Sequence, residues 1–398
     1  MESAADPNAA NAGPRPAPAV MQVLPALDIG GVERGTIDVA AAAAAAGWRS
    51  LVVSSGGGLV PELERAGAVH LTLPVASKNP AVMLGNAARL TALIRAHDVA
   101  LLHARSRAPA WSARLAARRC RLPFVTTFHG AYDTGTPFKH WYGRIMVGGE
   151  RTIAISDFIA EHIRRTFGTD PSRIATIPRG IDPRHFDPDR VSRERTTRLA
   201  AAWRLPADAA IVMLPGRLTR LKGQPVLIEA LARLARDDVY GLLVGTDQGR
   251  TRYRAELEAR IREAGLAGRV RIMDDMPDMP AAYMLADIVV SASTVPEAFG
   301  RGAVEGQAMG RPVIATDHGG ARETVLPGRT GWLVPPADPG ALARALAAAL
   351  ALDGDARERM ARAARAHVVG RFTVERMCAQ TLALYREVLA ERALPSSP

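Results

Sequence analysis

Residues 288–316 read IVVSASTVPEAFGRGAVEGQAMGRPVIAT. The β-branched runs Ile288–Ser291 and Pro312–Ala315 are typical of buried strands, and Arg301–Met309 between them is predicted to be a helix. A strand, a crossover helix and a second strand in this order form a unit whose two strands are parallel. The stretch therefore predicts an α/β fold built on a parallel sheet.

The same alternation fills the rest of the chain in two series. The first series predicts strands at Met21–Leu27, Arg49–Ser54, His70–Leu73, Val99–His103, Phe124–Thr127, Arg151–Ile155 and Ile174–Ile177. The second adds strands at Ile211–Leu214, Tyr240–Val244, Val270–Ile272 and Gly331–Val334 to the two quoted above. Apolar strands separated by helices indicate sheets covered on both faces. Two doubly wound units in tandem place their ligands at the carboxyl ends of the strands.

These series predict the organisation of the chain. Residues 1–19, mostly Ala, Pro and Asn, form a flexible leader, followed by a first Rossmann-like domain at 20–185 and a second at 196–373. The stretch Pro178–Arg195 is rich in Pro, Asp and Arg and is predicted to connect the two domains. A helix at about 374–393 is predicted to pack back on the first domain.

Composition excludes several classes of protein. Only two cysteines occur, Cys120 and Cys378, so neither a disulfide framework nor a cysteine-based metal site is expected. No apolar run approaches the roughly 18–20 residues of a membrane span, and residues 1–20 lack the apolar core of a secretory signal. We therefore expect a cytoplasmic protein.

Two glutamates follow the strand at 288–291. Glu297 lies in the loop and Glu305 lies within the next helix, so the two carboxylates can point at different parts of one ligand. The N–H groups of Phe299, Gly300 and Arg301 open that helix, where unpaired donors and the helix dipole favour a phosphate. Ionised carboxylates accept hydrogen bonds from sugar hydroxyls. The pattern indicates a site for a phosphorylated sugar.

Two glutamates separated by seven residues resemble the signature of the retaining GT-B glycosyltransferases of family 4, or group 1. The resemblance covers nearly all of residues 21–393 and is greatest for lipopolysaccharide-core enzymes of Gram-negative bacteria. It implies a GT-B fold, with two Rossmann-like domains facing a central cleft, the acceptor on residues 20–185 and a nucleotide-sugar donor on residues 196–373. It also implies that Glu297 contacts the transferred sugar and Glu305 the donor ribose.

The chain departs from this family in the helix that carries Glu305. Gly302 and Gly306 stand where the family usually has apolar or small residues. A glycine inside a helix costs roughly 1 kcal/mol relative to alanine. We therefore expect a weakened helix rather than altered chemistry.

Basic residues follow the first strand of the second series, in Pro215-Gly216-Arg217-Leu218 and Lys222. The planar fork of Arg217 and the point charge of Lys222 suit a diphosphate leaving group that gains charge as the glycosidic bond breaks. A basic helix start is the structural alternative. The resemblance implies that these two side chains replace the metal ion of other glycosyltransferases, so neither a metal nor a cofactor is expected.

A glycine loop, Gly30-Gly31-Val32-Glu33-Arg34-Gly35, follows the first strand of the chain. Its N–H groups suit a phosphate, which fits a dinucleotide enzyme as well. The spacing is not G-x-G-x-x-G, and no acidic residue closes the second strand, so the sequence disfavours NAD. The resemblance implies that Gly30 and Gly31 face the donor phosphates.

Several residues at other strand ends are weaker candidates. His129 can hydrogen-bond the transferred sugar, as the resemblance implies, although a lone histidine at a strand end is more often structural. Asp247 and Met273 are predicted to line the donor pocket. The remaining three, which either contact an anionic acceptor or form a capped, solvated turn, are His103, Arg105 and Arg107.

The predicted reaction is transfer of a hexosyl unit with retention, with mannose from GDP as the leading donor. The acceptor is a glycan or lipid-linked glycan, in lipopolysaccharide or other surface-polysaccharide synthesis. A GT-B nucleotide-sugar epimerase would need acid–base groups beyond His129. A phosphorylase would need a late lysine for pyridoxal phosphate, and none follows Lys222. A basic nucleic-acid-binding protein would interleave basic patches with aromatics, whereas the arginines here are dispersed.

The formal charge is +11, and lysine occurs only at 78, 139 and 222, so the excess is arginine. Either compositional bias or attraction to anionic partners explains it, such as nucleotide sugars or acidic lipid head groups. Basic segments at Arg114–Arg121 and Arg164–Arg173 either lie near an anionic inner membrane leaflet or form solvated faces. The predicted location is therefore cytoplasmic, with peripheral membrane attachment left open.

Overall fold

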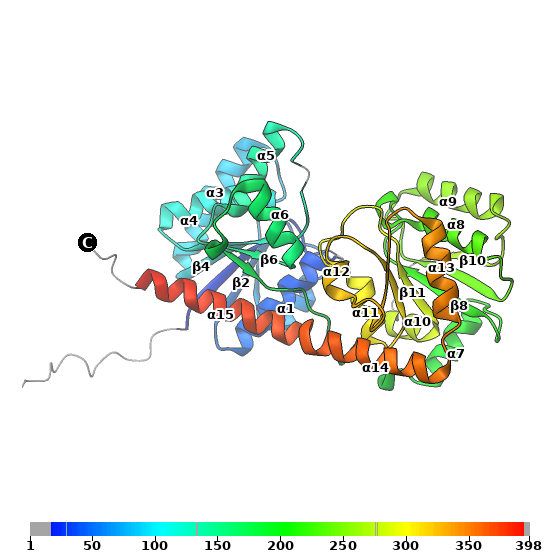
Figure 1. Ribbon diagram of the computed structural model, residues 1–398. Helices are drawn as coiled ribbons and strands as arrows, with labels where there is room; N and C mark the ends of the chain where they lie inside the picture. Colours follow the sequence, from blue (N-terminus) through cyan, green and yellow to red (C-terminus); the bar gives the residue numbers. More distant parts are fainter. Residues whose placement is uncertain (1–16, 29, 133, 275, 277, 394–398) are drawn as a thin grey trace, which may run out of the picture. The chain divides into compact units, whose positions relative to one another are not determined.

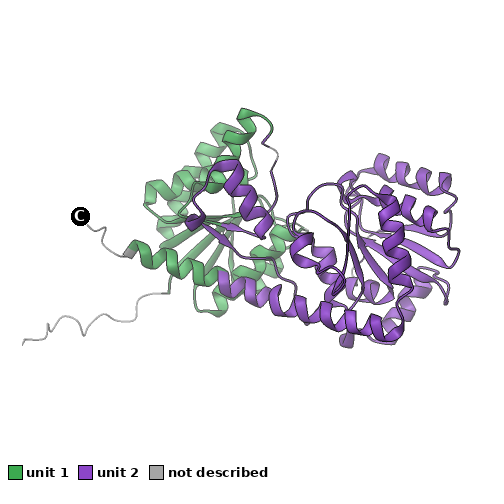
Figure 2. Ribbon diagram, in the orientation of Figure 1, with its two compact units in different colours: residues 1–127, 135–152, 381–398 green, residues 128–134, 153–380 purple. Residues whose placement is uncertain are grey.

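The computed structural model describes residues 17–28, 30–132, 134–274, 276 and 278–393. Most of the predicted leader, residues 1–19, lies outside these ranges. The chain divides into two compact units (Figure 2). The first contains residues 1–127, 135–152 and 381–398, and the second contains residues 128–134 and 153–380.

One sheet has seven strands in the order β3-β2-β1-β4-β5-β6-β7. Figure 1 labels β2, β4 and β6 of this sheet. Its strands are β1 (Ala19–Val23), β2 (Arg49–Ser54), β3 (Val69–Thr72), β4 (Val99–Ala104), β5 (Phe124–Phe128), β6 (Arg151–Ala154) and β7 (Ile174–Thr176). The helices are α1 (Gly31–Ala45), α2 (Val60–Arg65), α3 (Pro80–Ala96), α4 (Arg107–Cys120), α5 (Pro137–Gly143) and α6 (Asp157–Phe167), with the 3₁₀ turns η1 (Arg144–Val147) and η2 (Pro171–Arg173). The pairs of β1 with β2 and β4, of β2 with β3 and of β4 with β5 are parallel.

The other sheet has six parallel strands in the order β10-β9-β8-β11-β12-β13. Its strands are β8 (Ala210–Pro215), β9 (Val239–Val244), β10 (Val270–Met273), β11 (Ile288–Ser291), β12 (Val313–Thr316) and β13 (Gly331–Val334). The helices are α7 (Arg193–Ala202), α8 (Gln224–Leu234), α9 (Thr251–Glu263), α10 (Met279–Leu285), α11 (Arg301–Ala308), α12 (Ala321–Thr324), α13 (Pro339–Leu350), α14 (Gly354–Arg371) and α15 (Val374–Ala393), with the turns η3 (Pro188–Arg190) and η4 (Arg220–Lys222). The prediction of two doubly wound α/β sheets is confirmed.

The strand order creates a switch point in the six-stranded sheet. From β8 the chain proceeds outward through β9 and β10, and it then returns to the other side of β8 and proceeds through β11, β12 and β13. Ligands of open parallel sheets bind at the carboxyl ends of the strands where the order reverses, because the two loops there diverge. The loops that follow β8 and β11 are therefore the expected place for a ligand.

Apolar side chains on both faces of this sheet explain why it forms. On one face Leu214, Leu243 and Val290 are at most 1% exposed and share a core cluster with residues of α8 and α13. On the other face the alternate residues Met213, Leu242 and Val289 are 0% exposed, and Val289 lies against α11. Burying one such side chain contributes about 1.5–3 kcal/mol. The continuous apolar strands that the sequence shows are thus buried between helices.

The end of α15 belongs to the first unit. The Tyr385 hydroxyl lies 2.6 Å from Nδ1 of His103 on β4, and Arg151 forms ion pairs with Glu387 and Glu391. Both glutamate side chains are about half exposed, so these are surface ion pairs. The buried Tyr385 ring is therefore the stronger anchor, since surface ion pairs contribute little.

Two predicted segments differ from the structure. The first strand ends at Val23 rather than at residue 27, and Pro25, which lacks an N–H donor, follows closely. The predicted connection Pro178–Arg195 overlaps α7, whose first turn is capped by the Ser192 hydroxyl. No residue of α7 is buried, so its sequence carries no apolar stripe from which a helix could be predicted.

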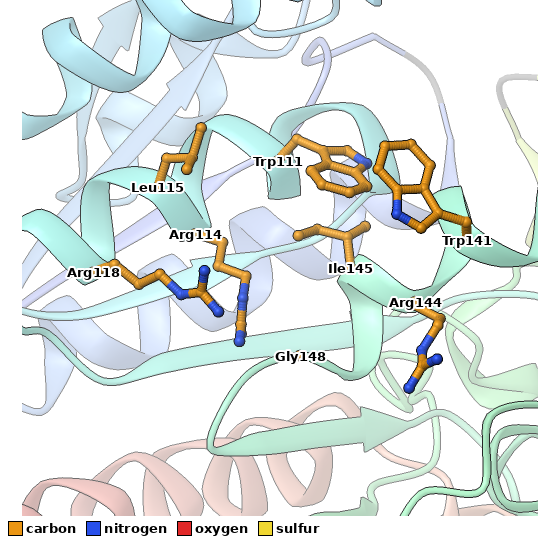
Figure 3. A pocket seen from close by; sticks show the side chains of 8 residues that line it. All are labelled: Trp111, Arg114, Leu115, Arg118, Trp141, Arg144, Ile145 and Gly148. Carbon is orange, nitrogen blue, oxygen red and sulfur yellow. The ribbon is translucent and has the colours of Figure 1, made fainter. Parts of the chain in front are cut away.

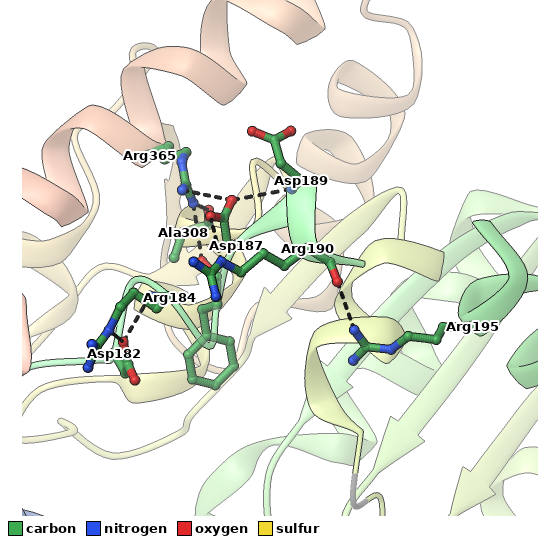
Figure 4. A network of polar contacts seen from close by, with 9 residues as sticks. Asp182, Arg184, Asp187, Asp189, Arg190, Arg195, Ala308 and Arg365 are labelled. Atoms are coloured by element: carbon green, nitrogen blue, oxygen red, sulfur yellow. Dashed lines mark hydrogen bonds and ion pairs between the residues drawn. The ribbon is translucent and has the colours of Figure 1, made fainter. Parts of the chain in front are cut away.

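Arg365 on α14 holds this connection in place (Figure 4). Its Nη1 donates to the carbonyl oxygens of Phe186 at 3.1 Å and Ala308 at 2.8 Å, and its Nη2 donates to Asp187 at 2.9 Å. Ala308 is the last residue of α11, so the guanidinium also sits where the helix dipole favours a cation. The contact ties the connection to the helix that carries Glu305.

The two glycines of α11 permit close packing on the sheet. A Cβ at Gly306 would lie 3.1 Å from three carbons of Val289 on β11, and one at Gly302 would lie 3.0 Å from Pro215 Cγ on β8. The cost of glycine to helix formation is thus offset by the close packing of α11 on β8 and β11, which a larger residue would prevent. Glycines serve the same purpose between helix and strand in other doubly wound sheets.

We predict that Gly306→Ala destabilises the protein by roughly 1–3 kcal/mol, because overpacking against Val289 exceeds the gain in helix propensity. Gly370→Ala on α14 is the matched control, since a Cβ there would meet nothing within 4 Å. That change should be neutral or stabilise by up to about 1 kcal/mol. Thermal and denaturant unfolding of both variants measure the difference, and equal stabilisation by the two would refute the packing argument.

Candidate active site

The loops after β8 and β11 lie against each other at the switch point. The N–H of Thr294 donates to the carbonyl oxygen of Leu221 at 2.9 Å. Gly223 has a φ of +71°, and a Cβ there would lie 1.8 Å from the oxygen of Ala292. Only glycine tolerates both this conformation and this contact. The chain is therefore built to bring the two loops into main-chain contact.

This contact brings together two of the predicted catalytic residues. Nζ of Lys222 lies 2.8 Å from each carboxylate oxygen of Glu297, and the side chains are 27% and 22% exposed. The Ser293 hydroxyl also donates to Glu297. An ammonium group has three N–H donors, so the pair leaves one of them for a further acceptor. The site thus holds a compensated charge pair with unused hydrogen-bonding capacity.

The pKa of Glu297 lies below its ordinary value. Burial acts to raise this pKa, but the charge and hydrogen bond of Lys222, the hydrogen bond of Ser293 and the charge of His318 together outweigh burial. Glu297 is therefore a carboxylate at neutral pH. It accepts hydrogen bonds, for example from sugar hydroxyls, and has no proton to donate as an acid.

A turn after β12 supports Glu297 from the other side. The N–H of Gly320 donates to the carbonyl oxygen of Glu297 at 2.8 Å, and a Cβ at Gly319, whose φ is +59°, would lie 2.4 Å from the same oxygen. Nε2 of His318 lies 2.9 Å from the carbonyl oxygen of Ser293 and therefore donates to it. Sequence reasoning missed Ser293 and His318. The run Asp317-His318-Gly319-Gly320 directly follows a predicted strand, which is the signal that could have identified His318.

The start of α11 has the geometry expected for an anion site. Gly300 is its N-cap, with a φ of +83° that favours glycine. Phe299 is only 5% exposed, and its ring packs edge-on against Phe372 at a centroid distance of 5.5 Å. The contribution of Phe299 to a ligand is therefore limited to its main chain. Gly300 and Arg301 lie at the helix start, and phosphate binding by the N–H groups of residues 299–301 stays a prediction.

Glu305 lies one turn into α11 and is 9% exposed. One carboxylate oxygen accepts from Arg301 Nη2 at 2.8 Å, and the other accepts from the hydroxyl of Tyr283 at 2.8 Å. Burial, then the charge of Glu305, raises the pKa of Tyr283 well above its ordinary value. A carboxylate offers about four acceptor positions, so these two bonds leave capacity for ribose hydroxyls. Tyr283 was not predicted, because an aromatic residue in a short helix suggests only core packing.

Arg217 lies on the same loop as Lys222 but points elsewhere. Its side chain is exposed, and Nη1 approaches Oε1 of Gln248 at 3.4 Å, in the loop after β9. Gly216 lies under the Lys222 stem, where a Cβ would be 3.4 Å from Cε, and its φ is +141°. The structure therefore joins Lys222 to Glu297, while the side-chain contact of Arg217 is with Gln248.

Two residues predicted to line the donor pocket, Asp247 after β9 and Met273 at the end of β10, make hydrogen bonds at this edge of the sheet. Oδ1 of Asp247 accepts from the N–H of Gly249 at 2.8 Å. The carbonyl oxygen of Met273 accepts from Gly245, and Gly216 donates to Val244. The carboxyl ends of β8, β9 and β10 are thus linked through main-chain hydrogen bonds.

Gly30 precedes α1 in the first unit. The Glu33 carboxylate packs directly against Gly30, since a Cβ at Gly30 would be 2.2 Å from Oε2 of Glu33. An acidic group at a helix N-terminus satisfies the helix dipole. The Glu33 carboxylate therefore lies at the start of α1, where Gly30 and Gly31 are predicted to face a donor phosphate.

Nδ1 of His129 lies 2.8 Å from Nη2 of Arg179, which is 7% exposed. Arginine only donates, so Nδ1 accepts and the ring hydrogen belongs on Nε2. Sequence reasoning did not anticipate this arginine as the partner that orients His129. A direct contact of His129 with a sugar stays a prediction.

The predicted acceptor residues His103 and Arg105 lie inside the fold, so the alternative of a solvated turn is wrong for these two, and their contact with an acceptor stays a prediction. His103 is 0% exposed, and its ring nitrogens lie 2.6 Å from the Tyr385 hydroxyl and 2.7 Å from the Thr127 hydroxyl. Burial, then the charge of Arg105, holds the pKa of His103 well below its ordinary value. Arg105 is 4% exposed and donates to Gln22 at 2.8 Å. Arg107 opens α4 with its guanidinium 5.8 Å from the centroid of the Tyr142 ring.

Within the described ranges, no group of three or more His, Cys, Asp and Glu side chains is arranged to hold a metal ion. None of the helices in the described part of the chain is long and apolar enough to span a bilayer.

Known proteins share this architecture. Residues 29–185 match the family described as Glycosyltransferase Family 4, and residues 196–367 match Glycosyl transferases group 1. A D-inositol 3-phosphate glycosyltransferase of Xylanimonas cellulosilytica is 35% identical over 295 residues, covering 70% of this chain and 69% of that protein. The enzyme of the same name from Jonesia denitrificans is 30% identical, covering 68% of each chain.

Solved structures agree with these matches. A glycosyltransferase from Rickettsia africae has a TM-score of 0.88 at 37% identity, covering 94% of this chain and 99% of that one. HepE from Anabaena, solved with UDP and glucose, has a TM-score of 0.80 at 26% identity, covering 93% and 99%. The two parallel sheets and these matches define a GT-B glycosyltransferase. The chain belongs to the family 4, group 1 glycosyltransferases.

We predict that Glu297→Gln lowers the stability at pH 7 by roughly 1–2 kcal/mol, because Lys222 loses its charged partner. The depressed pKa of Glu297 means that its stabilisation is present above the ordinary carboxyl pKa and is lost as the pH falls through the folded-state value. The gap between wild type and variant should therefore close on acidification below about pH 4.

Urea unfolding at a series of pH values measures this gap. Glu229→Gln removes an exposed i,i+4 pair with Arg233 and serves as the control, with a change of at most about 0.5 kcal/mol. A gap for Glu297→Gln that does not change with pH would contradict the ion pair as its cause.

Proposed function

We propose that the chain transfers a hexosyl unit, with retention, from a nucleoside diphosphate sugar to a hydroxyl of an anionic acceptor. The observation that carries this proposal is the Lys222–Glu297 contact at the switch point of the six-stranded sheet. A cation and an acceptor of hydroxyl hydrogen bonds stand side by side there. These are the groups that the phosphate and the sugar of such a donor require.

The leaving group is the first task of the site. In the proposed mechanism the remaining N–H of Lys222 binds the diphosphate, and Arg217 adds its fork after leaving Gln248. The amide groups of residues 299–301 supply a third source of positive potential. Lys222 and the amide groups are in position before charge develops on the departing phosphate, and such preorganised electrostatic stabilisation is usually the largest single contribution to catalysis.

The two glutamates position the donor in this mechanism. Glu297 accepts hydrogen bonds from hydroxyls of the transferred sugar, and Glu305 uses its remaining acceptor capacity for the ribose. Glu297 is bound by both Lys222 and Ser293, which favours positioning over attack on the anomeric carbon. We therefore propose front-face substitution, in which the departing phosphate receives the proton of the acceptor hydroxyl. The roles of His129, Gly30 and Gly31 in binding the donor stay predictions.

The proposals for the donor base and for the acceptor rest on what the relatives bind or act on. HepE was solved with UDP and with UDP-glucose, so we propose a UDP-sugar ahead of the GDP-mannose predicted from the sequence. Both relatives compared above are D-inositol 3-phosphate glycosyltransferases, which supports a phosphorylated acceptor. The predicted role in lipopolysaccharide synthesis gains no such support. Nor do the epimerase and nucleic-acid-binding alternatives.

We predict that Lys222→Ala lowers transfer by about 10²–10³-fold, as expected for the loss of one preorganised charge on the leaving group. Lys78→Ala, at an exposed position, is the matched control and should keep full activity. Thermal-shift measurements of the wild type with a panel of nucleotide sugars identify the donor. A ligand at about 100 times its dissociation constant stabilises by roughly 2.7 kcal/mol. Near-normal turnover of Lys222→Ala would overturn the proposed mechanism.

We also propose that transfer needs no metal ion, because Lys222, Arg217 and the helix start supply the positive charge. Turnover measured after treatment with EDTA should equal that of the untreated enzyme. Loss of turnover that Mg²⁺ or Mn²⁺ restores would show instead that a divalent ion binds the diphosphate.

A further inference from the structure

A pocket of about 390 Å³ opens on the first unit, between α4 and the α5–η1 segment (Figure 3). Two tryptophans line it, Trp111 and Trp141, whose rings are 4.6 Å apart. Three arginines also line it, Arg114, Arg118 and Arg144, and the remaining lining residues are two aliphatic side chains and a glycine. The described lining therefore contains cations and aromatic rings but no carboxylate.

The aromatic side chains next to the pocket are exposed to solvent. Phe138 and Trp141 are 69% and 54% exposed, and their i,i+3 spacing places them on one face of α5. Both contact the stacked cluster that includes Trp111 and Tyr142. Only 5% of the chain is aromatic, so this concentration is not a reflection of composition. Exposed aromatic patches mark interaction surfaces, and tryptophan favours the boundary between water and lipid.

The excess positive charge is concentrated in the same part of the chain. Residues 107–148 contain seven arginines and lysines and one acidic residue, Asp133, which is a formal +6 of the chain's +11. Within the described ranges, the guanidinium groups of Arg118 and Arg144 have neither an ion pair nor a hydrogen-bond partner. The other basic segment that the sequence suggested is different, because Arg164 and Arg165 both pair with Glu161.

We infer that the α4–α5 surface docks the enzyme on a membrane that contains anionic phospholipid. Phe138 and Trp141 enter the head-group region, and the arginines of the pocket bind a lipid phosphate. Apolar insertion and electrostatic attraction act together in interfacial binding. The inference extends the proposed function by naming the surface and partner of a peripheral enzyme. It does not depend on donor or acceptor identity.

Co-sedimentation with vesicles tests this surface, using the full chain without donor or acceptor. The wild type should bind phosphatidylcholine vesicles that contain phosphatidylglycerol and should not bind pure phosphatidylcholine vesicles. Phe138→Ser/Trp141→Ser and Arg118→Gln/Arg144→Gln should each weaken partitioning at least about tenfold, given about 1 kcal/mol for each basic residue near the surface. Binding should also fall as salt is raised.

Two controls separate this surface from general charge and hydrophobicity. Arg89→Gln/Arg95→Gln removes the same charge from exposed positions on α3, and Leu84→Ser removes an exposed apolar residue from the same helix. Both controls should bind vesicles as the wild type does, and every variant should keep the wild-type unfolding temperature and the nucleotide-sugar thermal shift. Failure of the wild type to bind anionic vesicles, or equal losses in test and control variants, would overturn the inference. A failed donor shift would instead count against the proposed function alone.

Discussion

The proposed donor site depends on a single constraint, which is that the loops after β8 and β11 must touch. Lys222 lies on one loop and Glu297 on the other, and their 2.8 Å contacts exist only because the main chains meet. Gly223 allows the first loop to reach the oxygen of Ala292, and Gly319 allows the turn after β12 to reach Glu297. The charge pair is therefore a consequence of main-chain geometry that residues without a side chain make possible.

The sequence predicts this part of the site because the rule that governs it is local. Parallel strands end at one edge of their sheet, so residues that follow the strands at 211–214 and 288–291 were expected at the same edge. The pairing of β8 with β11 then places the two loops side by side. The strand boundaries agree within a few residues along most of the chain. The pairing of Lys222 with Glu297 was not predicted, since each had been assigned to a different part of the ligand. Their contact in the structure shows that the groups also orient and neutralise each other.

Other features left no local trace in the sequence. His103 is buried by Tyr385, which lies 282 positions later in the chain, so no pattern near His103 could reveal its partner. The α7 helix buries none of its residues and therefore shows no apolar period. Arg217 has the predicted position on its loop, but its side chain direction depends on a contact with Gln248. Position along a strand end is thus predictable, whereas burial and side-chain direction depend on contacts between distant segments.

The identity of residue 222 has a physical explanation of its own. The chain has 51 basic residues, of which only three are lysine, so an arginine here would match the composition. The forked guanidinium binds a carboxylate through two parallel N–H groups, and at this position those bonds would be made to Glu297. The compact ammonium makes both bonds from one nitrogen and keeps a third donor. Its slender stem also passes over Gly216 with its Cε only 3.4 Å from where a Cβ would stand. A lysine therefore satisfies Glu297 and presents its third donor from the same nitrogen, whereas the three N–H groups that a bidentate guanidinium keeps point away from the carboxylate in the guanidinium plane.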